Sequence, residues 1–326
     1  MNYESGSGNS ESRILIIICF SEFYNSLIPI QNSFMTSLSQ KILTTLAYYD
    51  AMDYPMTSFE IWKYLMSWNI KGAFDDRSDG KSKIRDVAII DVIKELDSPD
   101  LKGKIEQYHG YYFLKGKKKL VEKRIERNKI VQIKLKIVRG VVRFLKFVPF
   151  LRMAAMTGTM AMKNSETKGD LDLLVILKHG HIFTGRLLVT FVTHILGKRR
   201  YADKITDRVC LNFFITEKSL STDPGKIFGA QRPDINAVSL FCAQEHFFIF
   251  PVFDSGCFEK FQRENPWIKD YFENFSPGTG ENMAMVKDSF FSKALRQIGE
   301  FLLSAEMIEK KLRTWQTRRI MGDKRT

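Results

Sequence analysis

Two aspartates separated by one residue, Asp170 and Asp172, open the apolar run Leu171 to Leu177. A run of this length that is rich in aliphatic residues is typical of a buried β-strand. Side chains two positions apart on a strand project to the same face, so the two carboxylates should lie together while Leu171 and Leu173 face the core. Neighbouring carboxylates repel each other, and burial makes their charged forms still more costly. The pair therefore predicts a bound cation, and hard oxygen ligands favour Mg²⁺, as one ion or two.

A Gly-Thr pair, Gly158-Thr159, follows the apolar run Met153 to Thr157 and precedes Asp170 by ten intervening residues. Glycine lets the chain turn sharply from a strand into a helix, and the first amides of that helix are free donors that suit phosphate oxygens. We expect Thr159 to place its hydroxyl at the N-cap. Many ordinary capped turns have the same sequence, so the pair gains meaning only from the aspartates that follow it.

The order of strand, Gly-[Ser/Thr], ten residues and Asp-x-Asp on a second strand resembles the DNA polymerase β-like nucleotidyltransferase superfamily, over about residues 140–220. The resemblance implies an α/β (α+β) core with a mixed sheet. It implies that Gly158 and Thr159 hold a nucleoside triphosphate, and that Asp170 and Asp172 bind magnesium. It also implies a third carboxylate on a later strand.

We interpret Val209 to Ile215 as that later strand, with Cys210, Asn212 and Phe214 on one face. By resemblance, the third carboxylate position is Asn212, and the nearest acids, Asp207 and Glu217, lie outside the strand. An amide carries no charge and takes up no proton at neutral pH, so Asn212 cannot act as a carboxylate base.

These residues are compatible with two functions. The leading prediction is a metal-dependent nucleotidyltransferase that moves a nucleoside monophosphate from a triphosphate, with ATP as the expected donor, to an unidentified acceptor and releases pyrophosphate. The alternative is a catalytically degenerate sensor, which binds Mg-nucleotide and acts through an N-terminal module. Asn212 is the feature that separates them.

The composition favours polyanionic partners, because 50 Lys and Arg against 37 Asp and Glu give a net charge of +13. Fourteen of these cations lie in residues 115–152, against two Glu. We expect residues 117–150 to form a connecting helix that attracts nucleic acid through a cationic face, although a solvated linker is an equal alternative. Its apolar face should carry Ile125, Ile130, Ile133, Ile137, Val141, Leu145 and Val148.

Residues 36–116 have the pattern of a winged-helix-like domain, with three helices before a hairpin. We expect the first helix to be capped by Ser39, the second by a capping box of Thr57 and Glu60, and the third to span Ile84 to Leu96. The hairpin should turn at His109-Gly110. The third helix is close to charge-balanced, which makes it a poor match for DNA phosphates and favours protein contact.

The remaining segments are less informative. Residues 1–35 are expected to be disordered or to precede the true start, 151–222 to form the nucleotidyltransferase core, and 223–326 to be a mainly helical C-terminal region. The four cysteines have no metal-ligand spacing, and reduced cysteines suggest a cytoplasmic location. The apolar run Ile14 to Phe20 is too short to span a bilayer, so no membrane partner is expected.

Overall fold

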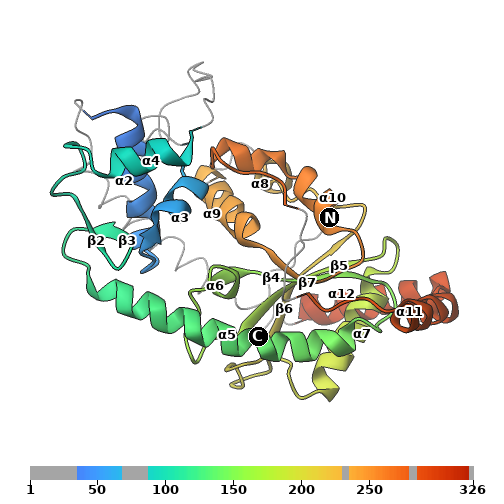
Figure 1. Ribbon diagram of the computed structural model, residues 1–326. Helices are drawn as coiled ribbons and strands as arrows, with labels where there is room; N and C mark the ends of the chain where they lie inside the picture. The colour runs from blue at the N-terminus through green and yellow to red at the C-terminus, as the bar shows by residue number, and fades with distance from the viewer. Residues whose placement is uncertain (1–34, 68–86, 230–234, 279–284, 323–326) are drawn as a thin grey trace.

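The computed structural model describes residues 35–67, 87–229, 235–278 and 285–322. The prediction for the N-terminal segment lies almost entirely outside these residues. The chain is mixed α/β, with a small helical unit at the N-terminus, a long helix leading away from it, and a larger body built on a four-stranded sheet (Figure 1).

The N-terminal unit contains α2 (Ser37–Asp50), α3 (Ser58–Lys63) and α4 (Ile89–Leu96). Its antiparallel sheet has the order β1-β3-β2, formed by Met56–Thr57, Tyr111–Leu114 and Ile105–Tyr108. The predicted hairpin is confirmed, because β2 and β3 pair antiparallel around the His109-Gly110 turn. The capping box of Thr57 and Glu60 at the start of α3 is confirmed as well.

Two helix starts in this unit differ from the prediction. The N-cap of α2 is Thr36 rather than Ser39, because the Thr36 hydroxyl accepts a hydrogen bond from the Ser39 amide at 3.0 Å. The third helix begins at Ile89, with Ala88 in an extended conformation at its N-cap position. The predicted start at Ile84 is therefore wrong, because Val87 and Ala88 are not helical, although residues 84–86 themselves lie outside the described residues.

The connecting helix α5 (Lys119–Leu145) has 27 residues, and the predicted faces are wrong in its first half. Ile125 and Ile133 are exposed there, whereas Arg124, Arg127 and Lys134 are buried. These cations can be buried because they donate to backbone carbonyls and carboxylates on the segment that leads to Asp170. In the second half, the predicted Val141 and Leu145 are buried in an apolar core, together with Val138 and Val142, which were not predicted.

The larger sheet has the strand order β6-β5-β4-β7. Its strands are β4 (Leu151–Met156), β5 (Leu171–Leu177), β6 (Val209–Thr216) and β7 (Phe250–Asp254). β4 runs antiparallel to β5 and β7, while β5 and β6 are parallel. The predicted bounds of β5 are confirmed. β7 was not predicted, so the C-terminal region supplies a strand of this sheet as well as helices.

Helices pack on both faces of the sheet. α5 and α7 (Ile182–Ile195) contribute to one apolar cluster, and α10 (Phe258–Arg263) contributes to the other. Short α6 (Gly158–Ala161) connects β4 to the loop before β5. The other elements are α8 (Pro224–Phe228), α9 (Ile235–Phe248), a 3-10 helix (Pro266–Asp270), α11 (Phe290–Leu303) and α12 (Glu306–Gly322).

Helix α9 links the two parts of the molecule. Its Leu240, Ala243 and Phe248 belong to the same apolar core as the buried residues of α2, and Tyr48 of α2 donates a hydrogen bond to Gln244 at 2.5 Å. Residues from the predicted segments 36–116 and 223–326 therefore share one core. None of the described helices is both long and apolar enough to cross a lipid bilayer.

Candidate functional site

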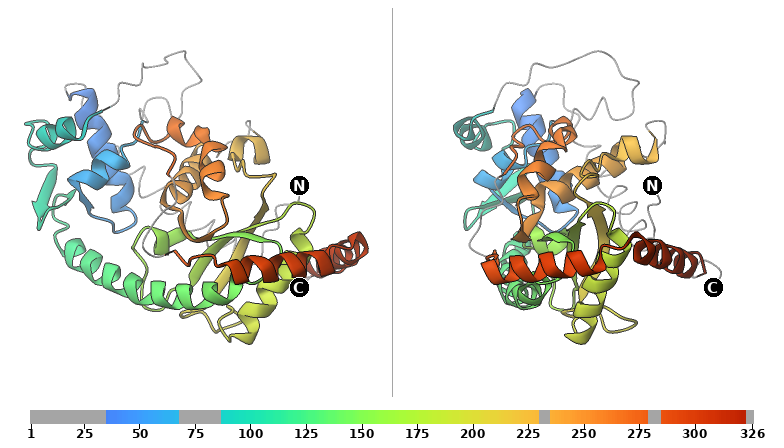
Figure 2. Two further views of the ribbon diagram at one scale, coloured as in Figure 1. Left: turned by 45° about the vertical axis from the view of Figure 1, so that its right-hand side comes forward. Right: turned by 90° about the vertical axis from the view of Figure 1, so that its right-hand side faces the viewer.

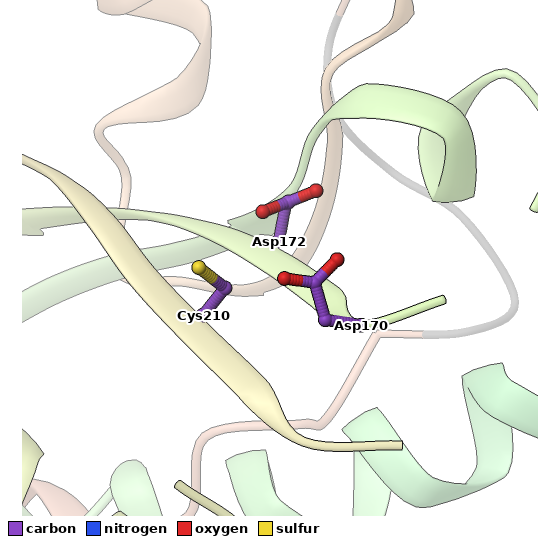
Figure 3. Close-up of side chains that lie close together, drawn as sticks. All are labelled: Asp170, Asp172 and Cys210. Atoms are coloured by element: carbon purple, nitrogen blue, oxygen red, sulfur yellow. The ribbon is translucent and has the colours of Figure 1, made fainter. Parts of the chain in front are cut away.

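Asp170 and Asp172 meet Cys210 at the edge of the sheet where β5 and β6 begin (Figure 3). Asp170 directly precedes β5, and Asp172 is its second residue. Cys210 stands opposite Asp172 in the parallel register. One oxygen of each carboxylate and the Cys210 sulfur all lie within 4.8 Å of one another. The structure thus brings together the two predicted aspartates and adds a thiol.

The two carboxylates have different surroundings. Asp170 accepts a hydrogen bond from Arg200 at 2.6 Å, which makes a charge-assisted ion pair. Burial, followed by the charge of Asp170, raises the pKa of Asp172 to about 6, against the opposing effects of the Cys210 thiol and Arg200. Burial and the charge of Asp172 raise the pKa of Cys210 to about 12. The thiol is therefore protonated at neutral pH, and the site has an excess of negative charge on its carboxylates.

The prediction put Cys210, Asn212 and Phe214 on one face of β6, and it is wrong for Cys210 and Phe214, which do not share a face. The register shifts after the pair of Asp172 and Cys210, so that two residues of β6 stand opposite one residue of β5. This is the geometry of a β-bulge, which changes the face on which the following side chains lie. Beyond it, Phe213 and Phe214 pack in the two opposite apolar clusters. The assignment of Asn212 to the third carboxylate position stays a prediction.

Gly158 lies directly against Asp172. It has a φ of +61°, and a Cβ at this position would lie 3.1 Å from Asp172 Oδ2, so glycine permits both the turn and the close approach. The predicted N-cap is wrong by two residues. α6 has only 4 residues, its N-cap position is Thr157, and Thr159 is the second residue of the helix.

Glu245 of α9 is a further acidic residue beside this pair. Its Oε2 atom accepts a hydrogen bond from the Gly158 amide at 2.9 Å. Burial raises the pKa of Glu245 to about 7, an effect that the Gly158 hydrogen bond opposes and the charge of Asp172 reinforces. Glu245 is 87 residues from Gly158 along the chain. No local motif marks Glu245, so it was not among the predicted site residues.

Buried cations of α5 hold the segment that joins Gly158 to Asp170. Lys134 donates to the Gly169 carbonyl at 2.5 Å and pairs with Asp207 at 3.1 Å. Arg124 donates to the Met162 and Lys163 carbonyls at 3.1 Å and 2.7 Å. Because Gly169 immediately precedes Asp170, the Lys134 contact positions the first carboxylate of the site.

The two acids nearest to β6 in sequence have partners of their own. Asp207 is paired with Lys134, and Glu217 accepts a hydrogen bond from Arg152 at 3.1 Å. Of the acids that the sequence analysis considered, only Asp170 and Asp172 lie in the cluster with Cys210.

Comparison with family models, curated proteins and solved structures gives no match for this chain.

Proposed function

We propose that this protein is a metal-dependent nucleotidyltransferase that binds a Mg-nucleoside triphosphate, with ATP as the expected donor, beside Asp170, Asp172 and Gly158. The observation that carries the proposal is the contact between these residues. Two carboxylates lie together, and the backbone of Gly158 approaches Asp172 so closely that a Cβ there would lie 3.1 Å from its Oδ2 atom.

The donor set fits a hard divalent cation. Asp170 and Asp172 offer carboxylate oxygens, which Mg²⁺ prefers. Burial and then the charge of Asp170 raise the pKa of Asp172, so its ionised form is costly without a cation and a bound cation would favour it. Cys210 does not fit Mg²⁺, because its thiol is protonated at neutral pH and sulfur is a soft ligand. When bound, the cation would neutralise charge on the triphosphate and align it for displacement of pyrophosphate.

The chain's own residues would prepare the site in three ways. Arg200 fixes the orientation of Asp170 by their ion pair. Lys134 fixes the backbone at Gly169, immediately before the first carboxylate. Gly158 leaves space beside Asp172 because it has no side chain. These contacts hold the carboxylates before any ligand arrives, which reduces the entropy lost on binding.

One observation favours a Mg-nucleotide sensor as the second candidate. The β6 residue that faces Asp172 is Cys210, which is neutral and cannot serve as the third carboxylate. A protein with this feature would bind nucleotide yet transfer slowly, since loss of a general base typically costs about 10²–10⁴-fold in rate.

Nucleic acid is one candidate acceptor. Although α5 buries three of its cations, others in residues 115–152 remain exposed: Lys115, Lys117, Lys118, Lys119, Lys123, Lys129, Lys136 and Arg143. Several of these flank the N-terminal half of α5. An RNA whose phosphates bind these cations would be held on the same protein molecule as the site.

The test is incubation of the full-length protein with labelled nucleoside triphosphates, Mg²⁺ and separate pools of cellular RNA and protein. We expect label in one pool, and no label with the double variant Asp170→Asn/Asp172→Asn. Binding of Mg-ATP without transfer would support the sensor. Absence of both binding and transfer would reject both functions.

A further inference from the structure

Helix α11 is attached to the protein by its polar side. Arg296 is buried, donates to the Lys146 carbonyl at 2.5 Å and pairs with Asp288 at 2.5 Å. Glu300 pairs with Arg152 at 2.7 Å and with Lys178 at 2.9 Å. These contacts fix one side of the helix on the body of the protein through ion pairs.

The opposite side of α11 exposes large apolar residues. Phe290 is 89% exposed and Phe301 is 83% exposed. Positions 291, 295, 298 and 302 recur every three or four residues and lie on one helical face. The apolar stripe consists of Phe290, Phe291, Leu295, Ile298, Phe301 and Leu302, and all six are exposed. Water-facing aromatic and aliphatic residues in such a row mark an interaction surface.

Exposed apolar residues also lie on the elements that neighbour α11. The ring of Phe291 lies 6.2 Å from that of Phe147, just beyond α5, and Phe144 near the end of α5 is exposed. On α12, Met307 and Trp315 are exposed and two turns apart. α11 and α12 both lie at the outside of the molecule, away from the N-terminal unit (Figure 2).

The charge around the apolar stripe is positive. Among the described residues of α11 and α12, the exposed charged side chains are one acid, Glu306, and six cations: Lys293, Lys310, Lys311, Arg313, Arg318 and Arg319. Glu306 is itself paired with Lys310 at 2.9 Å. On α12, Met307, Lys311, Trp315 and Arg318 share one face, so apolar and cationic groups alternate there.

We propose that α11 and α12 form a surface that adsorbs to an anionic lipid bilayer, with the apolar stripe in the headgroup region and the cations of α12 against lipid phosphates. Helices that lie in this region combine Trp, Phe and Leu on one side with Lys and Arg beside them. Adsorption differs from spanning and needs no helix that crosses the bilayer.

Two other occupants fit the surface less well. A second copy of this chain would bring the same six cations into apposition, and like charges oppose such pairing. Nucleic acid would satisfy the cations, but its interfaces are polar and would leave the apolar stripe in contact with phosphates and water. An anionic bilayer offers negative charge and an apolar interior at the same surface.

The test is cosedimentation of the full-length protein with vesicles of phosphatidylcholine alone and with added phosphatidylserine. We expect binding only to the anionic vesicles, with an affinity that falls as salt is raised. The affinity of the variant Phe291→Ser/Ile298→Ser for the anionic vesicles should be lower than that of the natural protein by a factor of about ten or more. The single variants Lys311→Ala and Arg318→Ala each remove one cation, and each should weaken vesicle binding about fivefold.

The matched control is Phe191→Ser/Ile195→Ser, which replaces two exposed apolar residues of α7 outside the apolar stripe. It should bind vesicles like the natural protein. Because all substituted residues are exposed, each variant should keep the natural melting temperature. The proposal is overturned if the natural protein does not bind anionic vesicles at low salt. It is also overturned if Phe291→Ser/Ile298→Ser binds them as tightly as the control Phe191→Ser/Ile195→Ser. Light scattering that shows a dimer lost only in Phe291→Ser/Ile298→Ser, without vesicle binding, would assign the surface to a second copy.

Discussion

The Gly158 amide and the Glu245 carboxylate are joined by a hydrogen bond of 2.9 Å. This contact connects α6, beside the aspartate pair, to α9, which shares its apolar core with the N-terminal unit. It also places a third carboxyl group near Asp172, and this group ionises as the pH rises through its pKa of about 7. Any triphosphate that approaches Gly158 would meet the Glu245 carboxylate, so this residue should control how tightly a nucleotide binds.

We expect Glu245→Gln to bind Mg-ATP about fivefold more tightly than the natural protein at about pH 8, where Glu245, with a pKa of about 7, is mostly ionised. At this pH the substitution removes a negative charge close to the phosphates, and one such charge at an intermediate dielectric corresponds to about 1 kcal/mol or more. Calorimetric titration measures the change. Glu259→Gln, which removes an exposed acid on α10, is the control and should leave the affinity unchanged. Weaker binding by Glu245→Gln would show that the carboxylate is needed for the ligand rather than in its way.

Asp172 should make the protein less stable as the pH rises. Its pKa in the folded state is about 6, above its ordinary value of 3.8, so between these values the folded protein holds a proton that the unfolded chain has lost. The folded state is therefore favoured at low pH, and that advantage disappears as the pH rises towards about 6.

Asp172→Asn should remove this dependence and raise the free energy of unfolding at pH 7 by about 1–3 kcal/mol, with little change near pH 4. Urea denaturation at both pH values, without metal, is the measurement. Asp203→Asn, an exposed acid in the loop before β6, should change stability by less than about 0.5 kcal/mol. A loss of stability at pH 7 in Asp172→Asn would show that the carboxylate is favourably placed even without a cation.

Several local features were predictable because their causes lie within a few residues. The apolar run of β5, the capping box at Thr57 and the turn at His109-Gly110 are set by neighbouring side chains, and the structure confirms each. β7 was missed because it follows α9 within one continuous apolar segment, and neither its length nor its periodicity separates strand from helix.

The burial of cations on α5 could not be predicted for a different reason. The helical periodicity of the sequence predicts that Lys134 is exposed, because periodicity takes no account of partners far along the chain. The partners that permit its burial, Gly169 and Asp207, lie 35 or more residues away. The same limit applies to Glu245, whose position depends on how α9 packs.

We expect Lys134→Met to lower the free energy of unfolding by about 1–3 kcal/mol. The methionine fills similar volume but leaves the Gly169 carbonyl and the half-exposed Asp207 without their donor. Lys136→Met is the control, because Lys136 is exposed on the same helix. Similar values for the two variants in urea denaturation would contradict the positioning role of Lys134.

Two single substitutions test which residue of β6 stands at the position of the third metal ligand. The resemblance assigns this position to Asn212, whereas the register places Cys210 opposite Asp172. We expect Cys210→Asp to raise the affinity for Mg²⁺ by about tenfold, or 1.4 kcal/mol, and Asn212→Asp to have a smaller effect. Metal titration by calorimetry compares them. The reverse order would return the third position to Asn212.

The central claim is that Asp170 and Asp172 form the Mg-nucleotide site, and calorimetric titration of Mg-ATP tests it most directly. The natural protein should bind, and the double variant Asp170→Asn/Asp172→Asn should remain folded yet show no magnesium-dependent binding. Circular dichroism and a melting curve establish that the variant is folded. Equal affinity of the two proteins for Mg-ATP would contradict the assignment of this site.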